Sequence, residues 1–267
     1  MTLPVDTGAG KWGDLWVRLV SAIVMVAVAG VEIWLGGHWF HLLIGVVCGL
    51  LVWELIRMIS PTDASQARQL GGIAGAAVLL SAYLPGAFAL PVLLAPVMAG
   101  VTMIRAKRGF WLAYAPVIML AGFTLMRLRD LNGAPWLLWL VAVVVASDVL
   151  GYFAGRLLGG PKFWPRVSPK KTWSGTVAGW IGAALVGWIF AGITGAGSSL
   201  IGISVAMAMA AQMGDIAESA IKRRVGVKDA SNLIPGHGGL PDPFDGMLGA
   251  AVFMLIAGQF GNVWIVS

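Results

Sequence analysis

One long polar stretch, QMGDIAESAIKRRVGVKDASNLIPGHGGLPDPFDG from Gln212 to Gly246, interrupts a chain that is otherwise mostly apolar. It contains five of the twelve acidic residues, four basic residues and a glycine-rich turn around His237. Charge placed in a membrane or at its edge is costly, and it is usually retained for function. The stretch therefore predicts both where the apolar helices are interrupted and where a functional site lies.

The rest of the chain has the composition of a membrane protein. Of its 267 residues, 58% are hydrophobic and 11% are charged, whereas a soluble domain averages roughly 25% charged residues. A membrane span needs about 20 largely apolar residues. We therefore expect an all-α polytopic integral membrane protein, folded as one integral domain with about nine transmembrane helices. The single Cys48 excludes an intrachain disulfide framework and is expected to lie in the core.

Hydropathy divides the chain into successive spans joined by short polar turns. The expected spans cover residues 15–35, 39–59, 71–83, 87–104, 110–126, 136–157, 173–193, 200–219 and 242–266. Residues 57–68 are expected to form a polar loop. We expect residues 1–135 to be a scaffold that contacts lipid or a second copy, and residues 136–267 to carry the site.

The distribution of basic residues predicts the orientation in the membrane, because cytoplasmic loops are enriched in Lys and Arg. With the N-terminus in the cytoplasm and the C-terminus outside, most basic loops fall on the cytoplasmic side, and only Arg127 and Arg129 disagree. The net charge of +6 is explained by these loops rather than by nucleic-acid binding.

The chemistry of the polar stretch suits a metal–polyphosphate site. Read as a helix, residues spaced i, i+4, i+7 and i+8 share one face, and they are Asp215, Ser219, Lys222 and Arg223. The carboxylate can hold a divalent ion, while the cations neutralise phosphate oxygens. The alternative is a solvated loop that follows a salt-bridged helix end.

Downstream residues add to the same chemistry. The glycines around His237 let backbone approach a ligand closely, and Asp242 and Asp245 offer the hard oxygen ligands that Mg²⁺ prefers. Asp242 could instead cap the last helix, since Pro243 after it is a favourable first helical residue.

Two further features lie upstream. Asp148 interrupts an apolar run, so we expect it to line a polar cavity with Arg156 as a candidate partner. Ser168 and Pro169 are interpreted as the cap and first residue of a helix. Lysines beside such a helix N-terminus would form an anion site, although an ordinary basic anchor touching acidic lipids explains them as well.

The order of these motifs resembles the CDP-diacylglycerol synthase (phosphatidate cytidylyltransferase) family. The family pattern reads S-x-x-K-R, K-D, P-G-H-G-G and D-R-x-D, and Ser219 to Asp245 follows it except that Pro243 replaces the arginine. A second family block, S-P-K-K-T-W-E-G, is matched by residues 168–175 except that Ser174 replaces the glutamate. The matches cover mainly residues 148–246.

The resemblance implies a nucleotidyltransferase of phospholipid biosynthesis that condenses CTP with phosphatidate to give CDP-diacylglycerol and pyrophosphate. It implies a multi-pass protein of the inner membrane, expected to be a homodimer, with its active site facing the cytoplasm. The implied cofactor is Mg²⁺, and a second metal ion is also open.

The residues expected in the site fall into three groups. Those expected to act in catalysis are Asp215, Lys222, Arg223, Asp242 and Asp245. The expected metal ligands are Asp215, Asp245 and Asp242. Those expected to bind substrate are Asp148, Ser168, Lys170, Lys171, Thr172, Ser219, Lys228, Asp229, His237, Gly238 and Gly239.

Other functions remain open from the sequence. An enzyme that activates a different lipid phosphate with CTP would differ in its lipid pocket, which the motifs do not specify. A transporter or channel could line its pathway with the charged segment, and a catalytically inactive family member could simply bind lipid.

Overall fold

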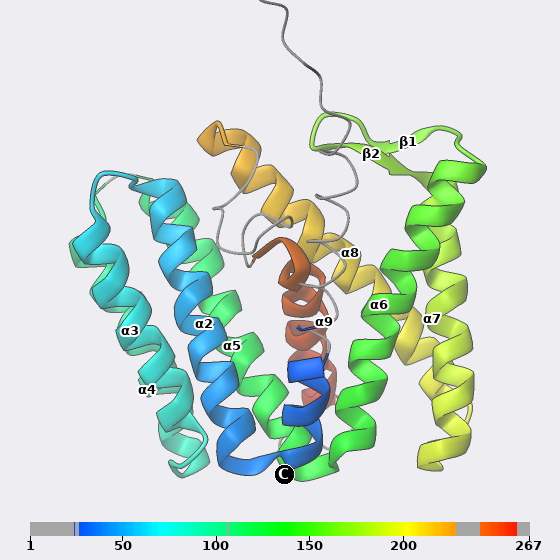
Figure 1. Ribbon diagram of the computed structural model, residues 1–267, viewed down its shortest axis with the longest axis horizontal. Helices are drawn as coiled ribbons and strands as arrows, with labels where there is room; N and C mark the ends of the chain where they lie inside the picture. Colours follow the sequence, from blue (N-terminus) through cyan, green and yellow to red (C-terminus); the bar gives the residue numbers. More distant parts are fainter. Residues whose placement is uncertain (1–23, 25–26, 106, 228–240, 261–267) are drawn as a thin grey trace, which may run out of the picture.

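The computed structural model describes residue 24 and residues 27–105, 107–227 and 241–260, and it is helical apart from one small hairpin (Figure 1). Residues 27–35 are helical. The elements that follow are α2 (Gly37–Ile59), α3 (Ala64–Ser81), α4 (Gly86–Met103), α5 (Arg108–Asn132), α6 (Ala134–Leu157), β1 (Lys162–Trp164), β2 (Ser168–Thr172), α7 (Trp173–Thr194), α8 (Ser199–Val225) and α9 (Pro241–Phe260).

Six helices are long and apolar enough to cross a membrane by length and composition, namely α2, α4, α5, α6, α7 and α8. They run side by side in Figure 1, with α8 inclined across the others. Many of their apolar side chains face outward, since Trp39, Trp188 and Ile193 are each more than half exposed. The protein is therefore a multi-pass membrane protein built of helices.

Several boundaries differ from those expected. The polar loop at 57–68 is much shorter, because α2 continues to Ile59 and α3 begins at Ala64. Gln66, Ala67 and Arg68 in this segment have high helix propensity. The polar side chains there therefore do not prevent α3 from beginning at Ala64. α8 likewise continues beyond the expected end at 219 to Val225, and Gly226 follows it in a left-handed conformation that favours glycine at helix ends.

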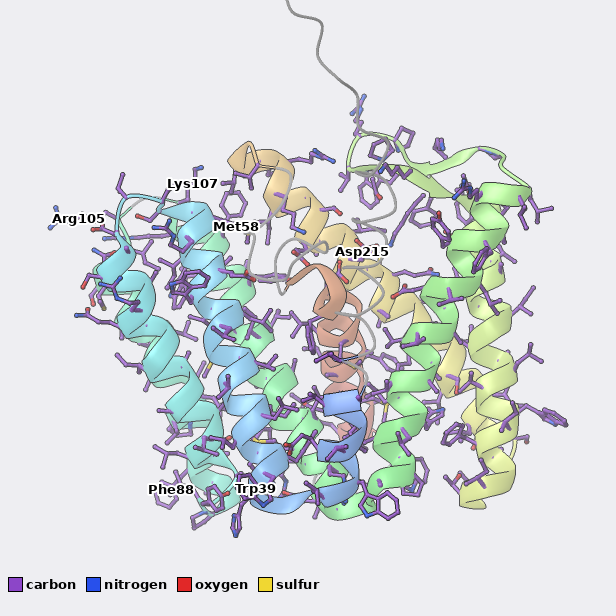
Figure 2. The ribbon with its side chains drawn as sticks, viewed as in Figure 1. Trp39, Met58, Phe88, Arg105, Lys107 and Asp215 are labelled. Atoms are coloured by element: carbon purple, nitrogen blue, oxygen red, sulfur yellow. The ribbon has the colours of Figure 1, made fainter. Side chains whose placement is uncertain are left out.

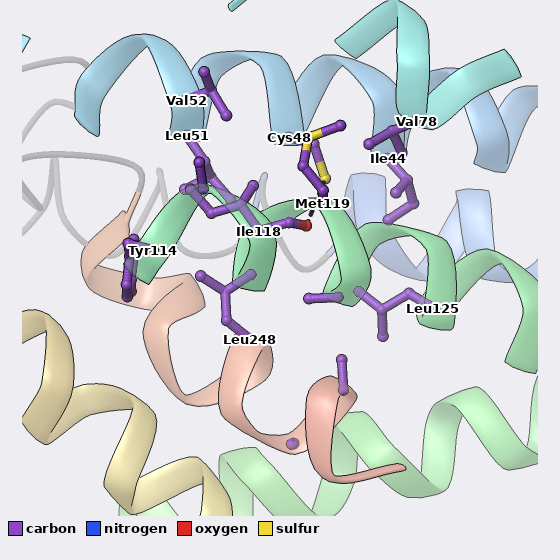
Figure 3. Close-up of a cluster of buried hydrophobic side chains, with 14 of the residues drawn as sticks. Ile44, Cys48, Leu51, Val52, Val78, Tyr114, Ile118, Met119, Leu125 and Leu248 are labelled. Atoms are coloured by element: carbon purple, nitrogen blue, oxygen red, sulfur yellow. Dashed lines mark hydrogen bonds between the residues drawn. The ribbon is translucent and has the colours of Figure 1, made fainter. Parts of the chain in front are cut away.

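The helices are held together by close glycine contacts and by an apolar core. A Cβ on Gly49 would lie 2.8 Å from the Gly71 carbonyl, so α2 and α3 touch backbone to backbone, as helices with small residues four apart do in membranes. Figure 3 shows the core between α2, α5 and α9, where Leu51, Ile118 and Leu248 are buried. Cys48 is buried in this core as expected.

The two ends of the molecule differ in chemistry. Figure 2 shows Arg105 and Lys107 at the same end as Asp215, and Trp39 and Phe88 at the opposite end. Arg129, which disagrees with the charge rule, has a structural role at that opposite end. Its guanidinium donates hydrogen bonds to the carbonyls of Ile33 (2.6 Å) and Trp34 (3.0 Å), where residues 27–35 end. It thereby satisfies carbonyls that a helix C-terminus leaves unpaired.

Candidate active site

Two carboxylates from different helices meet at the centre of the site. The carboxylate groups of Asp215 on α8 and Asp245 on α9 lie close to each other. Two carboxylates this close repel each other unless a proton or a cation lies between them. Asp148 on α6 is near enough for its charge to interact with that of Asp215. The structure therefore brings Asp215 and Asp245, two residues predicted to belong to the site, near each other.

Glycines on both helices make this meeting possible. A Cβ on Gly214 would lie 2.5 Å from the carbonyl oxygen of Asp245 and 3.2 Å from the Cα of Gly249. A Cβ on Gly249 would in turn collide with the carbonyl oxygen of Ala210. With side chains absent at these two positions, α8 and α9 pack backbone against backbone. The residues that follow Gly214 and precede Gly249 are thereby brought together.

The basic residues reach the carboxylates from a hairpin. The ammonium group of Lys171 forms an ion pair with Asp215, and it also donates a hydrogen bond to the carbonyl of Gln212 at 3.4 Å. Lys171 belongs to β2, which pairs antiparallel with β1, and its neighbour Lys170 is exposed. The hairpin therefore places Lys171 against Asp215 and Lys170 at the wall of the neighbouring cavity.

The interpretation of Ser168 and Pro169 as the start of a helix is wrong. Both lie in strand β2, and α7 begins at Trp173 after Thr172, whose hydroxyl accepts the Gly175 N–H at 3.2 Å. A residue before proline is biased toward extended backbone, so Ser168 continues a strand and Thr172 takes the capping role. Ser174, at the position of the family glutamate, donates a hydrogen bond to the Gly159 carbonyl and so closes the base of the hairpin.

A cavity of about 530 Å³ opens beside these groups. Its walls come from α6, β2, α7 and α8, and they include acidic, basic and hydroxyl side chains, among them Asp148, Arg156, Lys170, Lys171, Thr172 and Asp215. Asp148 thus lines a polar cavity as expected. Its expected partner does not pair with it, because the Arg156 guanidinium donates to the Tyr152 hydroxyl at 2.7 Å, one turn away on the same helix.

Of the remaining residues predicted to belong to the site, one contacts Asp215, and others point elsewhere or are not described by the structure. Ser219 donates a hydrogen bond to Asp215 at 3.4 Å, as their spacing predicts. Lys222 instead turns inward and forms a buried ion pair with Glu218 at 2.7 Å, while Arg223 is exposed. The side chain of Asp242 and the residues Lys228, Asp229, His237, Gly238 and Gly239 lie outside the part of the chain that the structure describes.

The donors present fit a magnesium ion, although they do not form a complete cage. No group of three or more His, Cys, Asp or Glu side chains within the described ranges is arranged to hold a metal. Magnesium commonly binds through one or two carboxylates, with substrate phosphates and water supplying the other oxygens. The neighbouring carboxylates of Asp215 and Asp245 supply two hard oxygen donors of this kind.

Sequence reasoning missed two polar residues that belong to this region. Gln212 lines the cavity, and its position directly after the apolar run 200–211 was the signal that could have identified it. Tyr114 on α5 is buried, and the acidic residues Glu218, Asp245 and Asp215 lie near it. It lies in the half of the chain that no motif covers, so the sequence held no comparable signal.

Comparison with known proteins shows the family to which the chain belongs. The family model described as "Cytidylyltransferase family" matches residues 16–260. A protein of Brucella abortus named "Phosphatidate cytidylyltransferase" is 34% identical over 264 residues, which cover 92% of this chain and 93% of that protein. Proteins of the same name from Helicobacter pylori and Mycobacterium bovis are 40% and 37% identical over about half of this chain, 49% and 51% respectively. The chain therefore belongs to the cytidylyltransferase family that its motifs resemble.

Proposed function

We propose that the protein is a phosphatidate cytidylyltransferase, which joins CTP and phosphatidate to form CDP-diacylglycerol and release pyrophosphate. Family membership and the names of its relatives support this activity. The observation in this chain that carries the proposal is the meeting of Asp215, Asp245 and Lys171 beside a polar cavity. Such a site suits the handling of phosphates within a membrane protein.

The reaction is a substitution at phosphorus. A phosphate oxygen of phosphatidate forms a bond to the α-phosphorus of CTP, and the bond from that phosphorus to the bridging oxygen of the leaving pyrophosphate breaks. A phosphate monoester has a second pKa of about 6, so the attacking group is already largely ionised near pH 7 and needs no general base. The main task of the protein is to bring two anions together.

The cations around the cavity fit this task. Lys171 is held in place by Asp215 and the Gln212 carbonyl, while the exposed Lys170 and the cavity-lining Arg156 remain close by. Their positive charges would neutralise phosphate oxygens of either substrate. Lys222 is already paired with Glu218, so we assign the direct phosphate contacts to the hairpin lysines first.

We further propose that Asp215 and Asp245 hold Mg²⁺, with Asp242 and a second ion as extensions of the same site. The proximity of the two carboxylates supports this assignment, because a divalent cation would relieve the repulsion between them. When bound, Mg²⁺ would supply charge neutralisation where the phosphates meet. The carboxylates themselves would hold that charge at the cavity wall.

The site is proposed to face the cytoplasm across an inner membrane that the chain crosses nine times. Its location at the end that also carries Arg105 and Lys107 supports this orientation. We also propose a homodimer with contacts in the N-terminal half. There an apolar groove of about 520 Å³ between α2 and α3 offers a surface that a second copy could cover.

The activity is tested by incubating purified protein in mixed micelles with labelled CTP, Mg²⁺ and a panel of lipid phosphates. We expect pyrophosphate release and a labelled lipid product with phosphatidate. A preference for an isoprenoid phosphate would identify the related activity instead. Nucleotide-independent solute flux in liposomes, with no labelled lipid, would contradict the proposal in favour of a transporter.

The site assignment is tested by Asp215→Asn, which removes one negative charge while keeping the shape of the side chain. We expect kcat to fall by about a hundredfold or more, because an electrostatic contact at the reacting phosphates is lost. Asp63→Asn is a matched control, since Asp63 is exposed before α3 and away from the cavity. Turnover near that of the unaltered protein in Asp215→Asn would overturn the assignment.

A further inference from the structure

Gln212 occupies the point where three helices meet beneath the proposed site. It lies one turn before Asp215 on α8 and lines the same cavity. Its side-chain oxygen accepts the indole N–H of Trp180 on α7 at 3.1 Å. Its side-chain nitrogen donates to the Ser147 hydroxyl on α6 at 3.3 Å and to the Thr176 carbonyl on α7 at 3.4 Å. One amide thus joins α6, α7 and α8.

The orientation of this amide is fixed by its partners. An indole N–H can only donate and a backbone carbonyl can only accept. The oxygen of Gln212 must therefore face Trp180, and its nitrogen must face Thr176. Space for the amide comes from Gly179, where a Cβ would lie 2.7 Å from the Gln212 nitrogen and 2.8 Å from the Ser147 hydroxyl. The neighbouring helices are shaped around this side chain.

The backbone of the same residue touches the site directly. The Lys171 ammonium group donates to the Gln212 carbonyl and pairs with the Asp215 carboxylate. The turn of α8 from Gln212 to Asp215 therefore sets where this lysine and this carboxylate meet. Any rotation or shift of that turn would move both of them relative to Asp148, which is on the opposing helix α6.

We propose that Gln212 is a positioning residue for nucleotidyl transfer, whose amide fixes α8 against α6 and α7 so that Asp215 and Lys171 keep their places at the cavity wall. The proposal rests on the assignment of this cavity as the active site. An amide that merely joined the helices would contribute to stability alone. One that positions the site must also affect turnover in protein that remains folded.

The pH dependence of kcat in Gln212→Glu distinguishes a positioning role from a purely structural one. The carboxylate can still accept from Trp180, but it cannot donate to Ser147 or Thr176 until it is protonated. We expect kcat about 10- to 100-fold below that of the unaltered protein at about pH 8, since small displacements of reacting groups have effects of this size. The ratio of variant to unaltered kcat should rise several-fold toward about pH 6, as protonation restores one donor. Gln69→Glu, at an exposed position on α3, is the matched control and should show a constant ratio.

Trp180→Phe provides a second variant that keeps an aromatic ring in place but removes the indole N–H. We expect a smaller loss of kcat, with KM for CTP changed by less than about threefold, because the amide loses one of the partners that orient it. Normal kcat in folded Trp180→Phe together with a pH-independent Gln212→Glu ratio would overturn the proposal. Absence of activity in the unaltered protein would instead count against the proposed function.

Discussion

At the scale of single residues, Lys222 is buried near the end of α8 although its side chain carries a charge. The lysine and Glu218 form an ion pair in which the two side chains are 10% and 1% exposed. Removing one partner of a buried ion pair destabilises a protein by about 3–5 kcal/mol, because the buried charge that remains loses its oppositely charged neighbour. The position therefore has a structural role that can be measured separately from any contact with phosphate.

We expect Lys222→Met to lower the Tm of the detergent-solubilised protein markedly. The double variant Glu218→Gln with Lys222→Met should recover much of that loss, because it removes the buried negative charge together with the positive one. Arg223→Met, at the exposed neighbouring position, should leave the Tm nearly unchanged. A double variant as unstable as Lys222→Met alone would show that the ion pair does not explain the loss.

At the scale of elements, the close packing of α8 against α9 brings the carboxylates of Asp215 and Asp245 near each other. Gly249→Ala would place a methyl group against the Ala210 carbonyl and push the two backbones apart. Asp245 precedes that contact by one turn of α9, so its carboxylate would move away from Asp215. We expect kcat/KM to fall by about tenfold or more, measured as labelled lipid formed from CTP and phosphatidate.

Gly202→Ala is the matched control for this prediction. Gly202 also lies within a long helix, α8, but a Cβ there would meet nothing within 4 Å. We expect its activity to stay within about twofold of the unaltered protein, since the substitution is neutral or mildly favourable to a helix. Equal losses in the two variants would mean that helix composition, and not the approach of α9, controls the site.

The bounds of the long helices could be predicted from the sequence, whereas the short hairpin could not. Hydropathy predicted the bounds of α2, α4, α6 and α7 to within a few residues, because a membrane span is a long, continuous run of apolar residues. The ordered motifs identified Asp215 and Asp245 before any contact was known. The hairpin was missed because β1 and β2 are only three and five residues long, too short for an alternation pattern to appear.

The direction in which Lys222 points was missed for a different physical reason. Helical spacing places Lys222 within one turn of Ser219, but spacing alone does not say which neighbour a face will meet. That choice is made by tertiary packing, here by the glycine contacts of α8 with α9 and by the burial of Glu218. The role of Gln212 could not be predicted for the same reason, since its partners Ser147 and Trp180 lie 65 and 32 residues away in the chain.

At the scale of the whole molecule, charge, cavity and hairpin all lie toward one end. Strands β1 and β2 lie at the end where α6 finishes and α7 begins (Figure 1), and Arg105 and Lys107 lie at the same end (Figure 2). Helices α7 and α8 meet at the other end, at Gly195 and Ser198. This arrangement makes the proposed orientation testable by labelling, because the two ends must then lie on opposite sides of the membrane.

We expect a cysteine at Ser198 to react with a membrane-impermeant maleimide applied to intact cells, and a cysteine at Lys162 to react only after permeabilisation. Both positions are exposed, one between α7 and α8 and the other on β1. The natural Cys48 is buried against the Ile118 carbonyl, so replacing it with alanine gives a clean background. Retained transfer of CMP to phosphatidate in each variant verifies the fold. The reverse labelling pattern would place the cavity outside the cell, away from cytoplasmic CTP, and would contradict both the orientation and the proposed role of the basic loops.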